Sequence, residues 1–291
     1  MGAAMVLPPL EQPKAVADRQ GDDVDEGEVF ERSARCVLGF SGRRGPLISP
    51  MAFWYDGAAL WMSTPASSVK ARALRRRPGC AVYVPLPGGD GAGVVATGEA
   101  RVFGLHDPLG LAVHGAVASA AMAALAARNT GTILGYVQDA RAVPARFRPR
   151  NRVVVRVALD GVRSVAAPAF SPGIAPALPQ VVAPSVRRAL VGQRTIALAT
   201  QAPNGTISVG PALWGSGFSV HLPAGEGPVA GPAAVHLGTD PGNRPTAVVG
   251  LSMVGEVREG RLQPSRATWW EGFSLTTVDL PRTAPTLTLP D

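Results

Sequence analysis

The chain contains a long internal repeat. Residues 36–54, CVLGFSGRRGPLISPMAFW, align without gaps with residues 196–214, IALATQAPNGTISVGPALW, about 160 positions later. In this alignment Trp54 meets Trp214. A repeat of this length is a whole domain rather than one unit of a solenoid. We therefore expect two domains of like fold, with any difference between them marking where function was kept.

A second pair of matching segments extends the repeat. GEAR at residues 98–101 matches GEVR at residues 255–258, at a slightly shorter spacing. The 291 residues are enough for two domains that each bury a core. We expect a flexible tail over residues 1–27, a first domain over 28–163, a proline-rich linker over 164–184 and a second domain over 185–291.

Short apolar segments between turn signals dominate both halves. In the first half they predict strands over residues 37–38, 47–55, 60–62, 81–84 and 94–103. In the second half the last two of these are matched by residues 233–237 and 246–257. Helical patterns cover residues 28–35, 109–128 and 185–193. The fold class predicted is mainly β with accessory helices, as two tandem antiparallel barrels.

Composition excludes several classes of protein. Cys36 and Cys80 stand in apolar segments without CxxC spacing, which predicts buried free thiols of an intracellular protein and no metal site. No segment approaches 18 uninterrupted apolar residues, and we expect a cytoplasmic protein with no membrane partner. The sequence lacks GxGxxG after a strand, GxSxG and clustered acid pairs, so dinucleotide-fold and hydrolase functions have no support.

The segment STPASSVKARALRRRP, residues 63–78, carries the clearest candidate site. Thr64 can cap a helix, and Pro65 suits its first position. A helix N-terminus offers backbone N–H groups and the positive end of a dipole, which hydroxyls and Lys70 would complement for a phosphate monoester. The alternative is a connecting helix whose last arginines only complement its C-terminal dipole. The hydroxyls belong to Ser63, Thr64, Ser67 and Ser68, and the arginines are Arg75, Arg76 and Arg77.

Three blocks in order, LISPMAFWYDG, LWMSTPASSVKARALRRRP and TGEARV, resemble the pyridoxamine 5′-phosphate oxidase-like family of FMN-binding split barrels. The resemblance covers about residues 30–103. It implies a cofactor between two barrels, and a homodimer, so that the tandem chain is similar to a dimer fused into one polypeptide. This pseudo-dimer is expected to be a monomer or a loose homodimer. The resemblance implies phosphate contacts from Ser63, Thr64, Ser68, Lys70 and Arg72, and ring contacts from Ser49, Pro50, Met51, Ala52 and Phe53 with Met62 nearby.

The second half departs from this pattern at the phosphate segment. Residues 222–234, LPAGEGPVAGPAA, contain no cation and no hydroxyl, and they include Glu226. A phosphate there would face an acidic side chain. We expect one site per chain, with the second half as its wall. By the same resemblance Trp269 and Trp270 approach the cofactor edge across the interface; barrel core is the alternative for these aromatics.

The expected function is a two-electron hydride transfer on a small organic substrate. FMN is the first choice of cofactor and a deazaflavin coenzyme the second, and no residue is assigned as catalytic. The competing hypothesis is a non-catalytic flavin or haem carrier, for which His221 and His236, at positions matching Met62 and Tyr83, are candidate haem ligands. An arginine-rich stretch lacks interleaved aromatics other than Phe147, which favours a solvated face over nucleic-acid binding. Its members are Arg141, Arg146, Arg148, Arg150 and Arg152.

Overall fold

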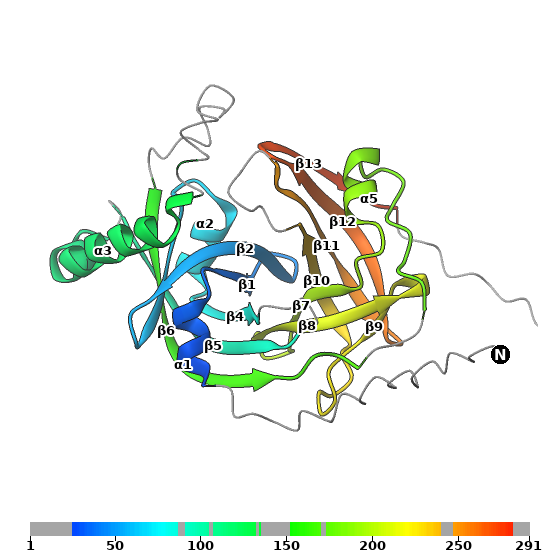
Figure 1. Ribbon diagram of the computed structural model, residues 1–291, viewed down its shortest axis with the longest axis horizontal. Coiled ribbons are helices and arrows are strands. Elements are labelled where there is room, and N and C mark those ends of the chain that lie inside the picture. The colour runs from blue at the N-terminus through cyan, green and yellow to red at the C-terminus, as the bar shows by residue number, and fades with distance from the viewer. Residues whose placement is uncertain are drawn as a thin grey trace, which may run out of the picture.

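The first half of the chain forms a closed antiparallel barrel. The computed structural model describes residues 25–86, 91–104, 107–131, 134, 152–169, 173–239 and 247–281. Around the first barrel the strand order is β1-β2-β3-β6-β5-β4, with β1 paired to β4 (Figure 1). The strands are β1 (Arg35–Ser41), β2 (Pro46–Tyr55), β3 (Ala59–Pro65), β4 (Gly79–Pro85), β5 (Gly93–Phe103) and β6 (Arg152–Val165).

The second half forms a ring with the same order of strands. Its sheet runs β11-β10-β7-β8-β9-β12-β13, and a further pairing of β11 with β12 closes six of these strands. Reading from β7, the ring is β7-β8-β9-β12-β11-β10, the order of the first barrel. Its strands are β7 (Thr195–Gln201), β8 (Ile207–Gly215), β9 (Ser219–His221), β10 (Gly231–Gly238), β11 (Val249–Arg258) and β12 (Arg261–Glu271), with β13 (Ser274–Asp279) added outside the ring.

The repeated GEAR and GEVR segments mark the same irregularity in both barrels. The register between β5 and β6 shifts at Gly98, and that between β11 and β12 shifts at Gly255. A Cβ atom at Gly98 would lie 2.0 Å from the carbonyl oxygen of Ala158, and one at Gly255 would lie 2.0 Å from that of Gln263. Both bulges therefore need glycine for a close backbone approach. The predicted fold, two split barrels in tandem, is confirmed.

The aligned tryptophans do not occupy equivalent places. The β1–β2 turn joins Ser41 to Pro46, whereas the β7–β8 turn joins Gln201 to Ile207 and is one residue longer. A shift of one residue moves a side chain to the opposite face of a strand. Trp214 accordingly lies in the core of the second barrel, while Trp54 packs outside the first, so the predicted equivalence of Trp54 and Trp214 is wrong.

Each barrel has its own apolar core, completed by helices. Helices α1 (Glu26–Arg32) and α2 (Val69–Arg76) add Phe30 and Leu74 to the core of the first barrel. Helix α5 (Pro184–Leu190) adds Val186 and Leu190 to that of the second. Helix α3 (Pro108–Arg128) packs outside the first barrel against Trp61 (Figure 1). A short 3-10 helix, Ser216–Phe218, leads into β9.

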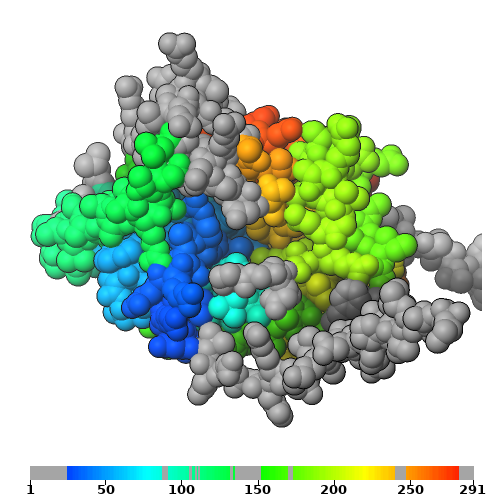
Figure 2. Space-filling view, in the orientation of Figure 1, coloured from blue at the N-terminus to red at the C-terminus, as the bar shows by residue number. Residues whose placement is uncertain are grey.

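The two barrels lie side by side (Figure 2). A third apolar cluster joins Ile48, Tyr83 and Val95 of the first barrel to Ile207 and Val209 of the second. Burial of apolar surface drives such contacts. Polar contacts add to this interface: Gln201 Nε2 donates to Ser41 Oγ at 3.1 Å, and Arg163 forms an ion pair of 2.5 Å with Glu226.

The predicted helices and strands exist with adjusted ends. The first lead-in helix begins at Glu26, because the Asp25 carboxylate caps it. Ser185 does not cap α5; its hydroxyl donates instead to Glu271 at 2.9 Å. The sequence patterns did not predict β6, and position 246, the predicted start of β11, lies outside the described residues, as does most of the predicted N-terminal tail. None of the described helices has both the length and the apolar composition that a membrane crossing requires.

Candidate functional site

Helix α2 follows the end of β3, but the predicted start of the helix is wrong: Thr64 and Pro65 are the last residues of β3, and α2 begins at Val69. Ser68 is its N-cap, and the hydroxyl of Ser68 accepts the backbone N–H of Ala71 at 3.1 Å. The hydroxyls of Thr64 and Ser68 share a hydrogen bond of 3.1 Å. A side-chain cap satisfies one of the free N–H groups at a helix start and fixes where the helix begins. The segment therefore brings two hydroxyls and a helix N-terminus to one place.

Lys70 reaches from α2 to β2. Its ammonium group donates to Ser49 Oγ at 2.8 Å and contacts the sulfur of Met51 at 3.1 Å. Both partners are neutral, and no ion pair joins Lys70 to a carboxylate within the described residues. Burial, helped by the positive charge of Arg152 and opposed by Cys36, lowers the pKa of Lys70 to about 8. An anion placed beside the ammonium would restore the interactions that burial removed.

Arg152 lies at the start of β6, next to the same segment. Its Nε donates to Ser63 Oγ and its Nη2 to the carbonyl oxygen of Ser63, each at 2.8 Å. This two-point contact fixes the end of β3 and brings a second cation close to Lys70. Arg152 thus belongs to the candidate site and not to an independent basic face; Arg141, Arg146, Arg148 and Arg150 lie outside the described residues.

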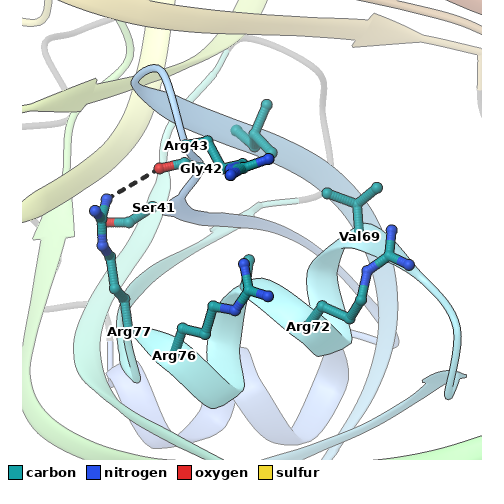
Figure 3. Close-up of a pocket in the computed structure, with 9 residues that line it drawn as sticks. Ser41, Gly42, Arg43, Val69, Arg72, Arg76 and Arg77 are labelled. Atoms are coloured by element: carbon teal, nitrogen blue, oxygen red, sulfur yellow. Dashed lines mark hydrogen bonds between the residues drawn. The ribbon is translucent and has the colours of Figure 1, made fainter.

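The outer face of α2 borders a cavity of about 590 Å³ (Figure 3). The opposite wall is the turn between β1 and β2, with Ser41, Gly42 and Arg43. Arg77 donates to the carbonyl oxygen of Gly42 at 3.0 Å and so ties the helix end to this turn. The described residues that line the cavity are Ser41, Gly42, Arg43, Leu47, Val69, Arg72, Ala73, Arg76 and Arg77.

The predicted residues of β2 and β3 divide between surface and core. Ser49 and Ala52 are partly buried and Pro50 is exposed, so their side chains are open to a ligand. Met51 is buried beside Lys70. Phe53 and Met62 have no exposed surface, because both pack in the core of the first barrel. The predicted contacts of a ligand with the side chains of Phe53 and Met62 are therefore blocked by the barrel core.

The two predicted tryptophans of β12 have different surroundings. Trp269 is buried in the core of the second barrel, which is the alternative considered for it from the sequence. Trp270 is partly buried and stacks on His236, with ring centroids 5.4 Å apart and planes 7° from parallel. Burial lowers the pKa of His236 to about 4, so this imidazole is neutral at pH 7. Trp270 is the tryptophan whose place allows a contact outside the barrel core.

The histidines are not disposed as a pair of ligands. His221 is exposed on β9 and its Nε2 lies 3.2 Å from Ser219 Oγ, whereas His236 is buried on β10. The predicted match of His221 with Met62 is off by one residue: Trp214, the core residue of β8, pairs with Val220 as Phe53 pairs with Met62. Among the described residues no group of three potential metal ligands gathers.

The second barrel lacks the features that surround Lys70. Leu38 pairs with Ser49 across β1 and β2, and the matching Leu198 pairs with Gly210, so the hydroxyl that accepts from Lys70 has no counterpart. No helix forms between β9 and β10. A smaller cavity of about 180 Å³ lies there, lined partly by Gly210, Glu226 and Arg163. The prediction that no cation is present there is wrong, because Arg163 of the first barrel reaches this place. Arg163 already forms an ion pair with Glu226.

The sequence predicted only Arg72 among the arginines of the larger cavity, as a phosphate contact beside Lys70; Arg72 lines the cavity instead, whereas Lys70 donates to Ser49. Arg76 and Arg77 entered only the alternative in which they complement the helix dipole, and Arg43 had no role. One signal was present: Arg72 and Arg76 are four positions apart and share a helix face, where like charges destabilise a helix. The approach of Arg43 depends on the path of the β1–β2 turn, which a one-dimensional pattern does not contain.

No protein-family model and no curated protein matches the sequence. Solved structures do match it. A protein of the pyridoxine phosphate oxidase family from Clostridium acetobutylicum, related to general stress protein 26, is 16% identical, with a TM-score of 0.31; the match covers 47% of this chain and 82% of that one. An FAD-binding protein from Mesorhizobium loti is 19% identical, with a TM-score of 0.36; the match covers 48% of this chain and 91% of that one. An F420 reductase is 19% identical, with a TM-score of 0.33; the match covers 48% of this chain and 96% of that one.

Both halves of the chain form six-stranded barrels with one order of strands, which is the tandem arrangement predicted from the sequence. Each of these matches spans about half of the chain, which is the extent of one barrel. With TM-scores below 0.5 these matches carry no argument, and the function is argued from the residues of the site.

Proposed function

We propose that the first split barrel binds a phosphate-bearing flavin-type cofactor beside the N-terminus of α2, with FMN as the first candidate and a deazaflavin coenzyme as the second. The observation that carries the proposal is the half-buried ammonium of Lys70, which has only neutral partners in Ser49 and Met51. A buried cation without a counter-charge is costly, and a phosphate group would supply that charge.

The residues around Lys70 fit a phosphate monoester. The hydroxyls of Ser63 and Ser68 can donate to phosphate oxygens, while the predicted contact of Thr64 is not available, because Thr64 is 1% exposed and its hydroxyl is bonded to that of Ser68. The first N–H groups of α2 add the positive end of a helix dipole. Arg152 would hold Ser63 in place and contribute positive charge. Hydrogen bonds between charged groups and phosphate are about twice as strong as neutral ones. This donor set suits a dianion better than a neutral group.

The chain would act by binding and orienting. A bound flavin or deazaflavin supplies two-electron hydride transfer. Ser49, Pro50 and Ala52 on β2 would border the cofactor ring, while Trp270 on β12 would approach it from the second barrel and exclude water. In the described part of the site no carboxylate or imidazole contacts Lys70 or lines the larger cavity, so no proton transfer is assigned to a side chain.

The lack of a proton-transferring side chain in the described part of the site also favours a second candidate function, a non-catalytic carrier of the same cofactor. A haem carrier is the less favoured variant, because His236 is buried beneath Trp270 and His221 stands apart on β9. The absorption spectrum of the purified protein distinguishes flavin, deazaflavin and haem. Reduction of the bound cofactor by a substrate, with multiple turnovers, would distinguish the oxidoreductase from the carrier.

Titration of the cofactor-free chain with FMN tests the phosphate site. Lys70→Ala should weaken binding by about 1.5–3 kcal/mol, the range for a hydrogen bond to a charged group. Arg188→Ala, which removes an exposed cation from α5 in the second half, is the matched control and should bind FMN as the wild type does. Circular dichroism of each variant checks the fold. Unchanged FMN affinity in a folded Lys70→Ala variant would refute the proposal.

A further inference from the structure

The larger cavity has a charge pattern distinct from the site around Lys70. Four arginines line it, from two separate segments: Arg43 from the β1–β2 turn, and Arg72, Arg76 and Arg77 from α2 and its C-cap. Figure 3 shows Arg72 and Arg76 rising from the helix toward the turn that carries Arg43. The described lining contains no acidic residue. Positive charges from different elements thus converge on one hollow.

These arginines are not paired with acids inside the described part of the chain. The ion pairs found there involve Arg32, Arg101, Arg163, Arg258 and Arg266, and none involves an arginine of the cavity. Arg72 and Arg76 repel each other along one helix face. This repulsion lowers the stability of the free protein, and a bound anion would relieve it.

The rest of the lining gives the cavity a defined shape. Leu47, Val69 and Ala73 add apolar side chains to the lining. The hydrogen bond from Arg77 to Gly42 holds the turn against the helix end and keeps the two walls together. Planar guanidinium groups around a hollow can each take two oxygens of a phosphate or carboxylate.

Within the described residues, the second barrel does not repeat this group of arginines. Its counterpart of α2 is a helix-free segment, and the smaller cavity there contains Arg163 already paired with Glu226. The convergence of arginines is therefore a property of the first barrel alone.

We propose that this cavity is a second anion-binding site, separate from the phosphate site at Lys70, for a small polyanion with several phosphate or carboxylate groups. Lys70 points from α2 toward Ser49, whereas Arg72 and Arg76 line the cavity on the outer face of the same helix. The site holds about 590 Å³, room for a chain of several such groups. Four cations without partner acids among the described residues match a multiply charged ligand better than a single phosphate.

Isothermal titration of the full chain with inorganic tripolyphosphate tests this site without any cofactor. The double variant Arg72→Gln/Arg76→Gln should lose affinity about tenfold or more, since two charged hydrogen-bond donors are removed. The matched control is Arg75→Gln, an exposed arginine of the same helix that does not line the cavity, and it should stay within about twofold of the wild type. Thermal unfolding of all variants verifies that they fold.

Further arms separate this site from its alternatives. Lys70→Ala should remove tripolyphosphate binding at the Lys70 site and leave the affinity of the arginine-lined cavity within about threefold, because that ammonium serves the other site. Orthophosphate should bind about tenfold more weakly or worse than tripolyphosphate. Comparison with triglutamate distinguishes a phosphate from a carboxylate ligand; tight binding of either supports the site.

Several results would overturn the inference. Equal losses in Arg75→Gln and in the double variant would show general attraction to a basic helix. A loss in Lys70→Ala as large as that in the double variant would mean a single site. Preferential binding of a single-stranded oligonucleotide, with affinity rising with its length, would indicate a nucleic-acid surface instead. Absence of tripolyphosphate binding at low salt would exclude a polyanion site altogether.

Discussion

At the scale of residues, Lys70 shows how one side chain couples fold and chemistry. Its stem crosses from α2 to β2, and its ammonium is held by Ser49 and Met51. The pKa of Lys70 is about 8 instead of its ordinary 10.5, because the protein removes water from the charged form and supplies no carboxylate. The same interactions that position the ammonium thus make its charge depend on pH near neutrality.

FMN affinity should therefore fall as pH rises through about 8. The ammonium binds phosphate and the neutral amine does not, so above the pKa of the free protein each pH unit should weaken binding by up to about tenfold. Between about pH 7 and 8 the phosphate is a dianion and Lys70 is charged, so affinity should be nearly constant. Fluorescence titrations from pH 6.5 to about 9.5 measure this profile.

Lys70→Arg is the control for this pH dependence. A guanidinium stays protonated throughout that range, so the decline above pH 8 should disappear, whatever the absolute affinity of the variant. The same decline in wild type and Lys70→Arg would assign the titration to another group and contradict the role given to Lys70.

At the scale of elements, the two β-bulges show which part of the repeat is structural. Gly98 and Gly255 occupy matching positions, and each lies directly against the carbonyl oxygen of the neighbouring strand. The sequence match between GEAR and GEVR therefore reflects a backbone requirement of the barrel and carries no information about a ligand.

Alanine at either bulge should destabilise its barrel. Gly98→Ala and Gly255→Ala would each force a strand apart, at a cost of about 1–3 kcal/mol, the usual range for overpacking. Gly79→Ala on β4 is the control, because a Cβ at Gly79 meets nothing within 4 Å; its effect should stay within about 0.5 kcal/mol. Denaturant unfolding measures all three. A stability of Gly98→Ala equal to that of Gly79→Ala would contradict the close approach.

Elements differ in how far their sequence predicts them. The turn signals and alternating patterns of β2 and β5 predict strands because one face of each is buried. The gapless alignment failed after the β7–β8 turn, because a turn can gain a residue while both strands keep their pairing. β6 was missed because a strand of 14 residues that follows an arginine-rich segment has no short turn-bounded pattern.

At the scale of the whole molecule, the chain combines two like barrels with unlike surfaces. The barrels share their order of strands and the position of their bulges, and one apolar cluster joins them. The pseudo-two-fold axis of an isologous dimer stays a prediction. The sequence predicted the like fold of the two barrels because the repeat is long. It also predicted the loss of the second phosphate segment, but it did not predict the arginine-lined cavity or the Arg163–Glu226 pair, which depend on contacts between segments distant in sequence.

This asymmetry leads to the central claim that the chain has one cofactor site and not two. Gly210 stands in the second barrel at the position that Ser49 has in the first, so the hydroxyl is missing there. The segment between β9 and β10 lacks both a helix and a lysine. A dianionic phosphate placed there would lie close to Glu226 and would have to compete for Arg163.

The most direct measurement is the stoichiometry of FMN binding to the cofactor-free chain by calorimetric titration. We expect one FMN per 30.0 kDa chain, with binding lost or strongly weakened in Lys70→Ala and nearly unchanged in Glu226→Ala. Two FMN molecules per chain, or equal losses of affinity in the two variants, would contradict the account.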